Sequence, residues 1–291
     1  MLKFTLVILL FLFTLTGNSQ SCYTGYLGKY SITLVMYHYS DDISHAYYVY
    51  NKYDNPIKVN GSLKEGELKL FEKDKSANTL ATLIFKNFKK NDKIIKGKWT
   101  NKSNTEGLQI LLKKDFDITN GDNVEWDTKE LIQSSSTKNH YFKTIITKEV
   151  GRFYGRIIGV KIFEKETDRL IQTIDLDCQL FGIDSVRIGD YNFDGIEDFS
   201  VFETSYAGPN TSSIYILRDV NSDKYIVSDF KGVSLEFDKD SKLIYEHNQC
   251  CAGRSHMNAT YKVVNNTMVL VQKKCIEYDS EKEDFIEVDC E

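Results

Sequence analysis

The strongest constraint on the fold is a period-two alternation of apolar and polar residues that recurs along most of the chain. Short runs rich in Tyr, Ile, Val and Phe are separated by turn residues such as Asp, Asn and Gly. Successive side chains of a strand point to opposite faces, so this alternation predicts half-buried strands. Turns spaced roughly eight to twelve residues apart favour antiparallel neighbours over βαβ units. We therefore predict a mainly β protein whose first part is an antiparallel meander.

Changes in this pattern divide the chain into regions. They are a signal peptide at 1–21, an N-terminal antiparallel β region at 22–114, a polar linker at 115–140 and a second β region at 141–291. Within the linker, Asp127 is a candidate N-cap for a short helix at 128–134. No internal repeat is evident.

The first residues predict export. Lys3 precedes an apolar run from Phe4 to about Leu15, and small and polar residues follow. Such a run is too short to span a bilayer comfortably, and its order of segments is typical of a secretory signal. We place the cleavage near Gln20 or Ser21 and expect the mature protein in the periplasm or outside the cell. No later segment is apolar enough to cross a membrane.

The cysteines fit an oxidising compartment. Their even number after the signal predicts disulfides, and they are Cys22, Cys178, Cys250, Cys251, Cys275 and Cys290. Adjacent Cα atoms lie about 3.8 Å apart, closer than disulfide geometry favours, so the two neighbouring cysteines should have different partners. The connectivity stays open. A lipid anchor on Cys22 is the alternative, which we disfavour because it would leave an odd number of thiols.

Charge and motifs argue against several function classes. The formal net charge is −5 with both signs mixed along the chain, and without a basic patch we expect no nucleic-acid partner. The sequence contains no G-x-S-x-G elbow, no H-E-x-x-H and no phosphate-binding glycine loop. We therefore predict that the protein is not an enzyme.

The stretch DYNFDGIED at 190–198 carries the clearest chemical signal. Oxygen-bearing groups fall at alternate positions around a central glycine, as in calcium-binding loops. The predicted Ca²⁺ ligands are the side chains of Asp190, Asn192, Asp194 and Asp198 with the carbonyl of Ile196. The alternative is a polar hairpin turn, which also favours Asp, Asn and Gly. The twelfth position is Val201 rather than the Glu of an EF-hand.

Taken with SYAGPN at 205–210 and HNQCCAG at 247–253, this loop makes 141–291 resemble a known group. The resemblance is to exported calcium-binding proteins that inhibit lysozyme-like peptidoglycan hydrolases, including immunity proteins against bacterial effectors. It implies a β-propeller-like or β-sandwich region, one bound calcium, a hydrolase as protein partner and an inhibitory loop formed by Ser205, Tyr206, Ala207, Gly208, Pro209 and Asn210. The N-terminal half resembles a domain of unknown function common in exported bacterial proteins.

Two function classes remain after this reading. The first is an exported calcium-binding inhibitor of a lysozyme-like hydrolase. The second is a secreted carbohydrate-binding or structural surface module without inhibitory activity, for which aromatic residues such as Tyr47, Tyr48 and Tyr50 are candidate contacts. Core packing is the commoner use of such aromatic residues in strands.

Overall fold

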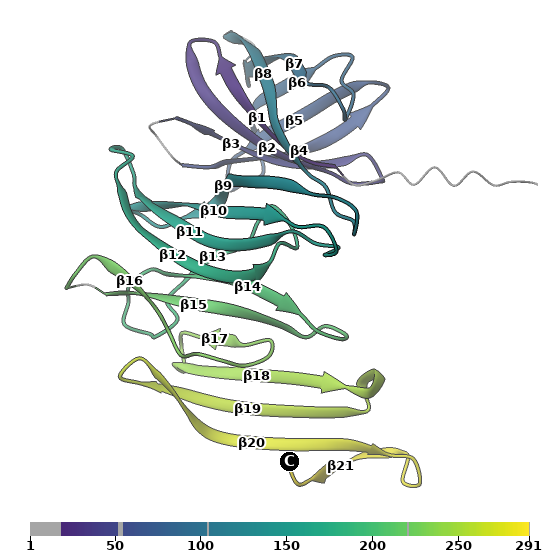
Figure 1. The fold of residues 1–291 in the computed structure, drawn as a ribbon, viewed down its shortest axis with the longest axis vertical. Helices are drawn as coiled ribbons and strands as arrows, with labels where there is room; N and C mark the ends of the chain where they lie inside the picture. The colour runs from purple at the N-terminus through teal and green to yellow at the C-terminus, as the bar shows by residue number, and fades with distance from the viewer. Residues whose placement is uncertain (1–18, 52–54, 104, 220, 291) are drawn as a thin grey trace, which may run out of the picture.

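The computed structural model describes residues 19–51, 55–103, 105–219 and 221–290, and within them the chain is built from antiparallel strands. A closed barrel lies at one end, and three further sheets follow it along the long axis of the molecule (Figure 1). The prediction of a mainly β protein that begins with an antiparallel meander is confirmed. Within these ranges, no helix is long and apolar enough to cross a membrane.

The barrel is an eight-stranded meander in which β1 pairs with both β2 and β8 and so closes the ring. Its strands are β1 (Ser19–Leu27), β2 (Tyr30–His38), β3 (Ile43–Tyr50), β4 (Ile57–Lys64), β5 (Glu67–Lys73), β6 (Thr79–Phe85), β7 (Ile94–Asn101) and β8 (Gly107–Ile118). Apolar side chains at alternate positions fill its interior, including Tyr23, Leu34, Leu70 and Leu83. Closure leaves no free sheet edge in this part of the protein.

Three meander sheets follow the barrel in chain order. The first sheet contains β9 (Trp126–Ser136), β10 (His140–Lys148), β11 (Arg156–Glu164) and β12 (Leu170–Gln179). The second sheet contains β13 (Val186–Gly189), β14 (Asp198–Ser205), β15 (Thr211–Asp219) and β16 (Lys224–Val227). The third sheet contains β17 (Glu236–Asp238), β18 (Leu243–Cys250), β19 (Ser255–Val264), β20 (Thr267–Asp279) and β21 (Asp284–Val288), with a 3₁₀ turn at Cys251–Gly253 after β18.

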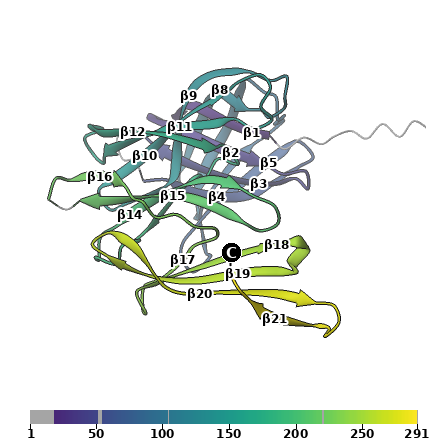
Figure 2. The same ribbon diagram turned by 60° about the horizontal axis from the view of Figure 1, so that its bottom comes forward.

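A single apolar core joins the barrel to the first two sheets. Val35 and Tyr47 point outward from the barrel into this core, where they meet residues of the first sheet such as Phe142 and of the second sheet such as Phe199. A separate, smaller core that includes Tyr215 and Ile244 joins the second sheet to the third. The sheets therefore form a continuous stack, which Figure 2 shows from a second direction.

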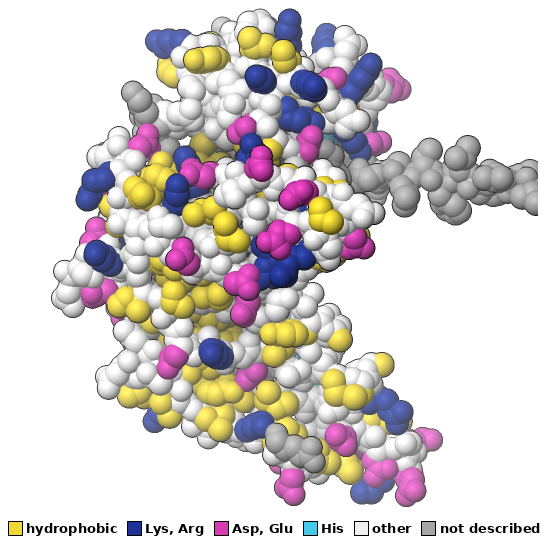
Figure 3. Space-filling model, viewed as in Figure 1, with side chains coloured by type: hydrophobic (Ala, Val, Ile, Leu, Met, Phe, Trp, Pro, Cys, Tyr) yellow, Lys and Arg dark blue, Asp and Glu magenta, His cyan; other side chains and the backbone are white. Residues whose placement is uncertain are grey.

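Fewer apolar side chains are buried toward the C-terminal end of this stack. The third sheet has few fully buried side chains, and Leu270 and Val271 on β20 are 52% and 56% exposed. In the space-filling view, apolar side chains gather on the surface over the second and third sheets (Figure 3). The tightly packed part of the molecule is thus the barrel with the first two sheets.

The predicted helix at 128–134 is wrong, because this segment lies within β9. Leu131 and Ile132 pair with Thr144 and Lys143 of β10, and both side chains are buried in the shared core. Pairing with a neighbouring strand and burial of both faces outweigh a weak local helix preference. The predicted linker at 115–140 is correspondingly shorter, since β8 continues to Ile118 and β9 begins at Trp126.

The start of β1 bears on the predicted signal cleavage. Ser19 pairs with His38 of β2 and Gln20 pairs with Ile118 of β8, so a cut at Gln20 or Ser21 would remove residues of this strand. The Cys22 side chain is 4% exposed and packs in the shared core. A lipid on that sulfur would have to displace this packing. Residues 1–18 of the predicted signal lie outside the described residues.

Two glutamines connect the first sheet to the second by hydrogen bonds to backbone groups. Gln133 on β9 donates from Nε2 to Thr144 Oγ1 at 2.9 Å and accepts at Oε1 from the Ser185 N–H at 2.9 Å. Gln172 on β12 donates from Nε2 to the Tyr225 carbonyl at 2.8 Å and accepts from the Tyr225 N–H at 2.9 Å. These bonds lie on the two outer strands of the first sheet and fix how the second sheet packs on it.

We expect Gln133→Ala to lower the free energy of unfolding by about 1–3 kcal/mol, because the buried Ser185 N–H would lose its acceptor. The matched control is Gln272→Ala on β20, an exposed site whose change should stay within about 0.5 kcal/mol. Urea unfolding followed by intrinsic fluorescence measures both. Equal midpoints for the two variants would contradict a bridging role for Gln133.

Candidate functional site

The segment 190–198 forms the connection between β13 and β14 at one end of the second sheet. Asp190 accepts hydrogen bonds from the Asp194 N–H at 3.0 Å and the Gly195 N–H at 2.9 Å. Asp194 accepts from the Ile196 N–H at 2.8 Å, and Gly195 has a φ of +89°. The side chains of Asp190, Asn192 and Asp194 are therefore folded inward over the turn, with glycine at the position of left-handed backbone.

Asp198 has a different environment from the other acidic residues of this loop. Its carboxylate is buried, and it accepts from the Tyr191 N–H at 2.9 Å and from the Arg218 N–H on β15 at 2.8 Å. Burial raises the pKa of Asp198 to about 6, and the nearby charges of Asp194 and Asp190 add to this effect. Asp198 thus ties the loop to the sheet, and it lies close enough to Asp194 and Asp190 for their charges to act on it.

The chemical types of the oxygen atoms in this loop match those that bind calcium. Carboxylate, amide and carbonyl oxygens are the ligands that Ca²⁺ takes, and Asp198 keeps lone pairs beyond its two hydrogen bonds. Within the described residues, however, no three His, Cys, Asp or Glu side chains converge into a metal-binding group. Asn192 also contacts the third sheet, donating to Asn266 Oδ1 at 2.9 Å in the turn between β19 and β20.

The predicted inhibitory loop at 205–210 is the hairpin between β14 and β15. Residues 205–209 are exposed, and Tyr206 at 52% is the large apolar side chain of the tip. β14 runs from Asp198 to Ser205, so the hairpin and the acidic loop lie at opposite ends of that strand, about 23 Å apart. A calcium ion at the acidic loop would not touch this hairpin.

The base of the hairpin is instead held by Asn210, which is 7% exposed. Its Nδ2 donates to Asn248 Oδ1 at 2.9 Å and to the Gln249 carbonyl at 2.8 Å, and its Oδ1 accepts from the Gln249 N–H at 3.2 Å. Across the turn, the Tyr206 N–H donates to the Asn210 carbonyl at 2.8 Å. An exposed tip thus stands on a base fixed to β18 of the third sheet. These contacts could not be predicted from local sequence patterns, because the bonded residues are 38 and 39 positions apart.

One disulfide joins Cys275 on β20 to Cys290 just after β21. Cys22 and Cys178 are buried free thiols, and burial raises the pKa of Cys178 to about 12. Cys250 and Cys251 are exposed, with their sulfur atoms 2.7 Å apart. Of the disulfides predicted for the six cysteines, the described residues contain the one pair of Cys275 and Cys290.

A cleft of about 730 Å³ opens between the barrel and the first two sheets. Tyr37, Tyr39, His45, Lys58 and Asn60 form its barrel wall, and Phe181, Asp184, Arg187, Phe202, Thr211 and Ser213 are among the residues opposite. This cleft was not predicted from the sequence, since its two walls come from the predicted N-terminal and C-terminal β regions. The only sequence signal for the cleft was the repeated aromatic residues of the N-terminal strands.

Two of the three tyrosines considered for a carbohydrate surface are not available to a ligand on the surface. Tyr47 and Tyr48 are 2% and 1% exposed. The Tyr47 hydroxyl donates to the Ile132 carbonyl of β9 at 2.7 Å, and Tyr48 belongs to the core inside the barrel. These residues serve packing, as the commoner use of strand aromatics suggested.

The sequence was also compared with known proteins. No protein-family model matches the chain, and no curated protein matches its sequence. The resemblance to inhibitors of lysozyme-like hydrolases therefore stays a prediction.

We expect non-reducing peptide mapping to recover Cys275 and Cys290 as one linked pair. Closing a loop of this length should stabilise the protein by about 3 kcal/mol through constraint of the unfolded chain. In the folded protein, iodoacetamide should label Cys250 and Cys251 but not Cys22 or Cys178, and all four should label after denaturation. A mapped bond from Cys250 or Cys251 to either buried cysteine would contradict the arrangement described here.

Proposed function

We propose that this protein is an exported, calcium-binding β-protein that binds and inhibits a lysozyme-like peptidoglycan hydrolase, acting as a protective or immunity inhibitor. The observation that carries the proposal is the hairpin at 205–210, with its exposed Tyr206 and its base fixed by Asn210. The hydrolases of this class hold their substrate in a cleft, and an inhibitor needs a projecting element to enter it. The hairpin supplies such an element.

Preorganisation supports this use of the hairpin. Binding costs free energy when a loop must be ordered, and that cost falls when the loop is already held in its bound conformation. The three hydrogen bonds of the Asn210 side chain restrict the hairpin base before any partner arrives. The rigidity comes from the third sheet, so inhibition and calcium binding are separable in this proposal.

Turbidity assays of peptidoglycan lysis test the inhibitory role. Wild-type protein in molar excess should slow at least one enzyme in a panel of goose-, chicken- and invertebrate-type lysozymes and muramidases encoded in the same genome. Tyr206→Ala should weaken inhibition about tenfold or more, as loss of a central aromatic anchor does at interfaces. Asn210→Ala should weaken it by loosening the hairpin.

Tyr26→Ala on β1 is the control, because Tyr26 is 57% exposed and thus comparable with Tyr206. This variant should inhibit like the wild type. Equal inhibition by Tyr206→Ala and the wild type would exclude the hairpin as the inhibitory element. No inhibition of any enzyme in the panel would exclude the function.

Calcium binding is proposed at Asp190, Asn192, Asp194, the Ile196 carbonyl and Asp198. The inward-folded oxygens of the loop and the repulsion that Asp194 and Asp190 exert on Asp198 support this assignment. A bound cation would relieve that repulsion. It would also hold the loop against the third sheet, because Asn192 donates to Asn266.

Thermal melts with EDTA and with calcium test the site. Calcium at ten times its dissociation constant should add about 1.4 kcal/mol of stability if it binds only the folded protein. Asp194→Ala should abolish this gain, and Asp198→Asn should reduce it. Asp279→Ala is the control, since Asp279 caps another exposed turn by accepting from the Glu281 N–H, and its calcium response should be unchanged. Identical wild-type melts in EDTA and calcium would show that the loop is only a turn.

A further inference from the structure

We propose that the cleft between the barrel and the first two sheets binds an oligosaccharide that carries an anionic group. This site is distinct from the hairpin at 205–210, and the inference does not rest on hydrolase inhibition. Its volume of about 730 Å³ lies in the range usual for small-molecule sites. The two walls offer the two kinds of contact that a sugar ring needs.

Aromatic rings supply the first kind of contact. Tyr37 and Tyr39 lie with ring centroids 4.3 Å apart on the barrel wall, and Tyr39 meets His45 edge-on at 5.3 Å. On the opposite wall Phe181 and Phe202 lie 5.7 Å apart. Tyr39 is 38% exposed and Phe181 56% exposed, so both keep free ring surface. Rigid aromatic surfaces of this kind present large contact areas to the apolar C–H faces of sugar rings.

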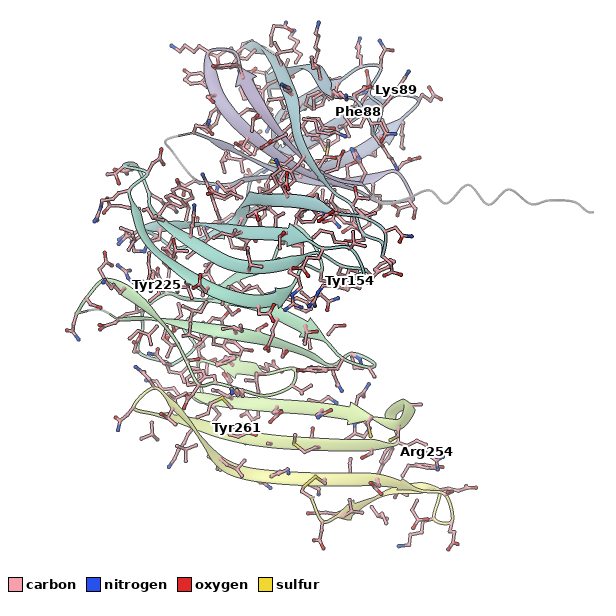
Figure 4. The ribbon with its side chains drawn as sticks, in the orientation of Figure 1. Phe88, Lys89, Tyr154, Tyr225, Arg254 and Tyr261 are labelled. Carbon is pink, nitrogen blue, oxygen red and sulfur yellow. A yellow bond between two sulfur atoms is a disulfide. The ribbon has the colours of Figure 1, made fainter. Side chains whose placement is uncertain are left out.

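A further aromatic ring, which does not line the cleft, lies near Phe181. The Phe181 ring lies 6.0 Å from the ring of Tyr154, a residue of the connection between β10 and β11 that Figure 4 labels. Phe181 itself lies in the segment between β12 and β13. Contacts with two neighbouring rings restrict the orientations of an exposed ring, which lowers the cost of stacking a ligand on it.

Polar groups supply the second kind of contact. His45 Nδ1 and Asn60 Oδ1 are paired at 2.5 Å, which fixes both side chains at the cleft wall and leaves the Asn60 amide N–H₂ available to a hydroxyl or acetamido group. Thr211 and Ser213 place hydroxyls on the other wall. A purely apolar ligand would cover the Asn60 amide N–H₂ without offering it an acceptor, which disfavours a lipid.

The charges of the cleft favour an anion. Lys58 and Arg187 line it from opposite walls, and Asp184 is its one acidic lining residue. Among the described residues, neither cation forms a salt bridge with an acidic side chain. A locally cationic cleft on a chain of net charge −5 is selective for a negative group. A sugar carboxylate matches the bidentate geometry of Arg187.

Isothermal titration calorimetry with the purified protein tests the proposal without any hydrolase. The probes are a hyaluronan tetrasaccharide, which carries carboxylates, and the neutral tetrasaccharide of N-acetylglucosamine. Wild type should bind both and should prefer the anionic probe. Phe181→Ala and Tyr39→Ala should each weaken both affinities about tenfold, the size of effect expected for a lost aromatic contact with its buried area. Lys58→Gln with Arg187→Gln should remove the preference for the anionic probe.

The controls are Phe285→Ala on β21, which is 43% exposed and outside the cleft, and Lys96→Gln on β7. Neither should change binding. Failure of both probes to bind at millimolar concentration, or equal binding by the Phe181→Ala and Phe285→Ala variants, would overturn the proposal. Binding of an acidic peptide such as oligoglutamate, dependent on Phe181 and without saccharide binding, would overturn it in favour of a protein ligand. Lysozyme inhibition is unaffected by any of these outcomes, so the two proposals fail separately.

Discussion

The arrangement of the whole molecule depends on one shared core between the outer wall of the barrel and the first two sheets. Phe142 of the first sheet lies 4.5 Å from Phe199 of the second, and Phe199 lies 5.1 Å from Tyr225, ring centroid to ring centroid. Val35 and Tyr47 enter the same core from the barrel. Because a sheet with an apolar face must cover it, the barrel caps the stack at one end. Because this core holds the barrel against the two sheets, it also determines how the two walls of the cleft are placed.

The meander connectivity of the second sheet separates its two candidate functions. Successive connections of a meander alternate between the two ends of the strands. The loop before β14 and the hairpin after it therefore lie at opposite ends of that strand. The acidic loop contacts the third sheet through Asn192 and Asn266, whereas the hairpin contacts it through Asn210. The cleft opens on the hairpin side, since Thr211 and Ser213 line it. A calcium ion would therefore stabilise the packing of sheets rather than shape the binding surfaces.

Much of the fold was predictable because strand periodicity is a local signal. Runs such as those around Leu34 and Ile162 alternate or stay apolar according to whether one or both faces are buried. The acidic turn was also predictable, since the hydrogen bond between the Gly195 N–H and Asp190 joins residues only five positions apart. The segment 128–134 was not, because the partners that make it a strand are in β10 and the shared core.

The sequence by itself determined the class of secondary structure, the position of the acidic turn and the presence of an exposed loop at 205–210. Each of these depends on interactions between residues close in the chain. Only the tertiary structure decided that the first eight strands close into a barrel, that Asn210 fixes the hairpin to β18, that Cys275 pairs with Cys290, and that Tyr39 and Phe181 line one cleft. These features join residues far apart in the chain, and local periodicity carries no information about which distant strands become neighbours.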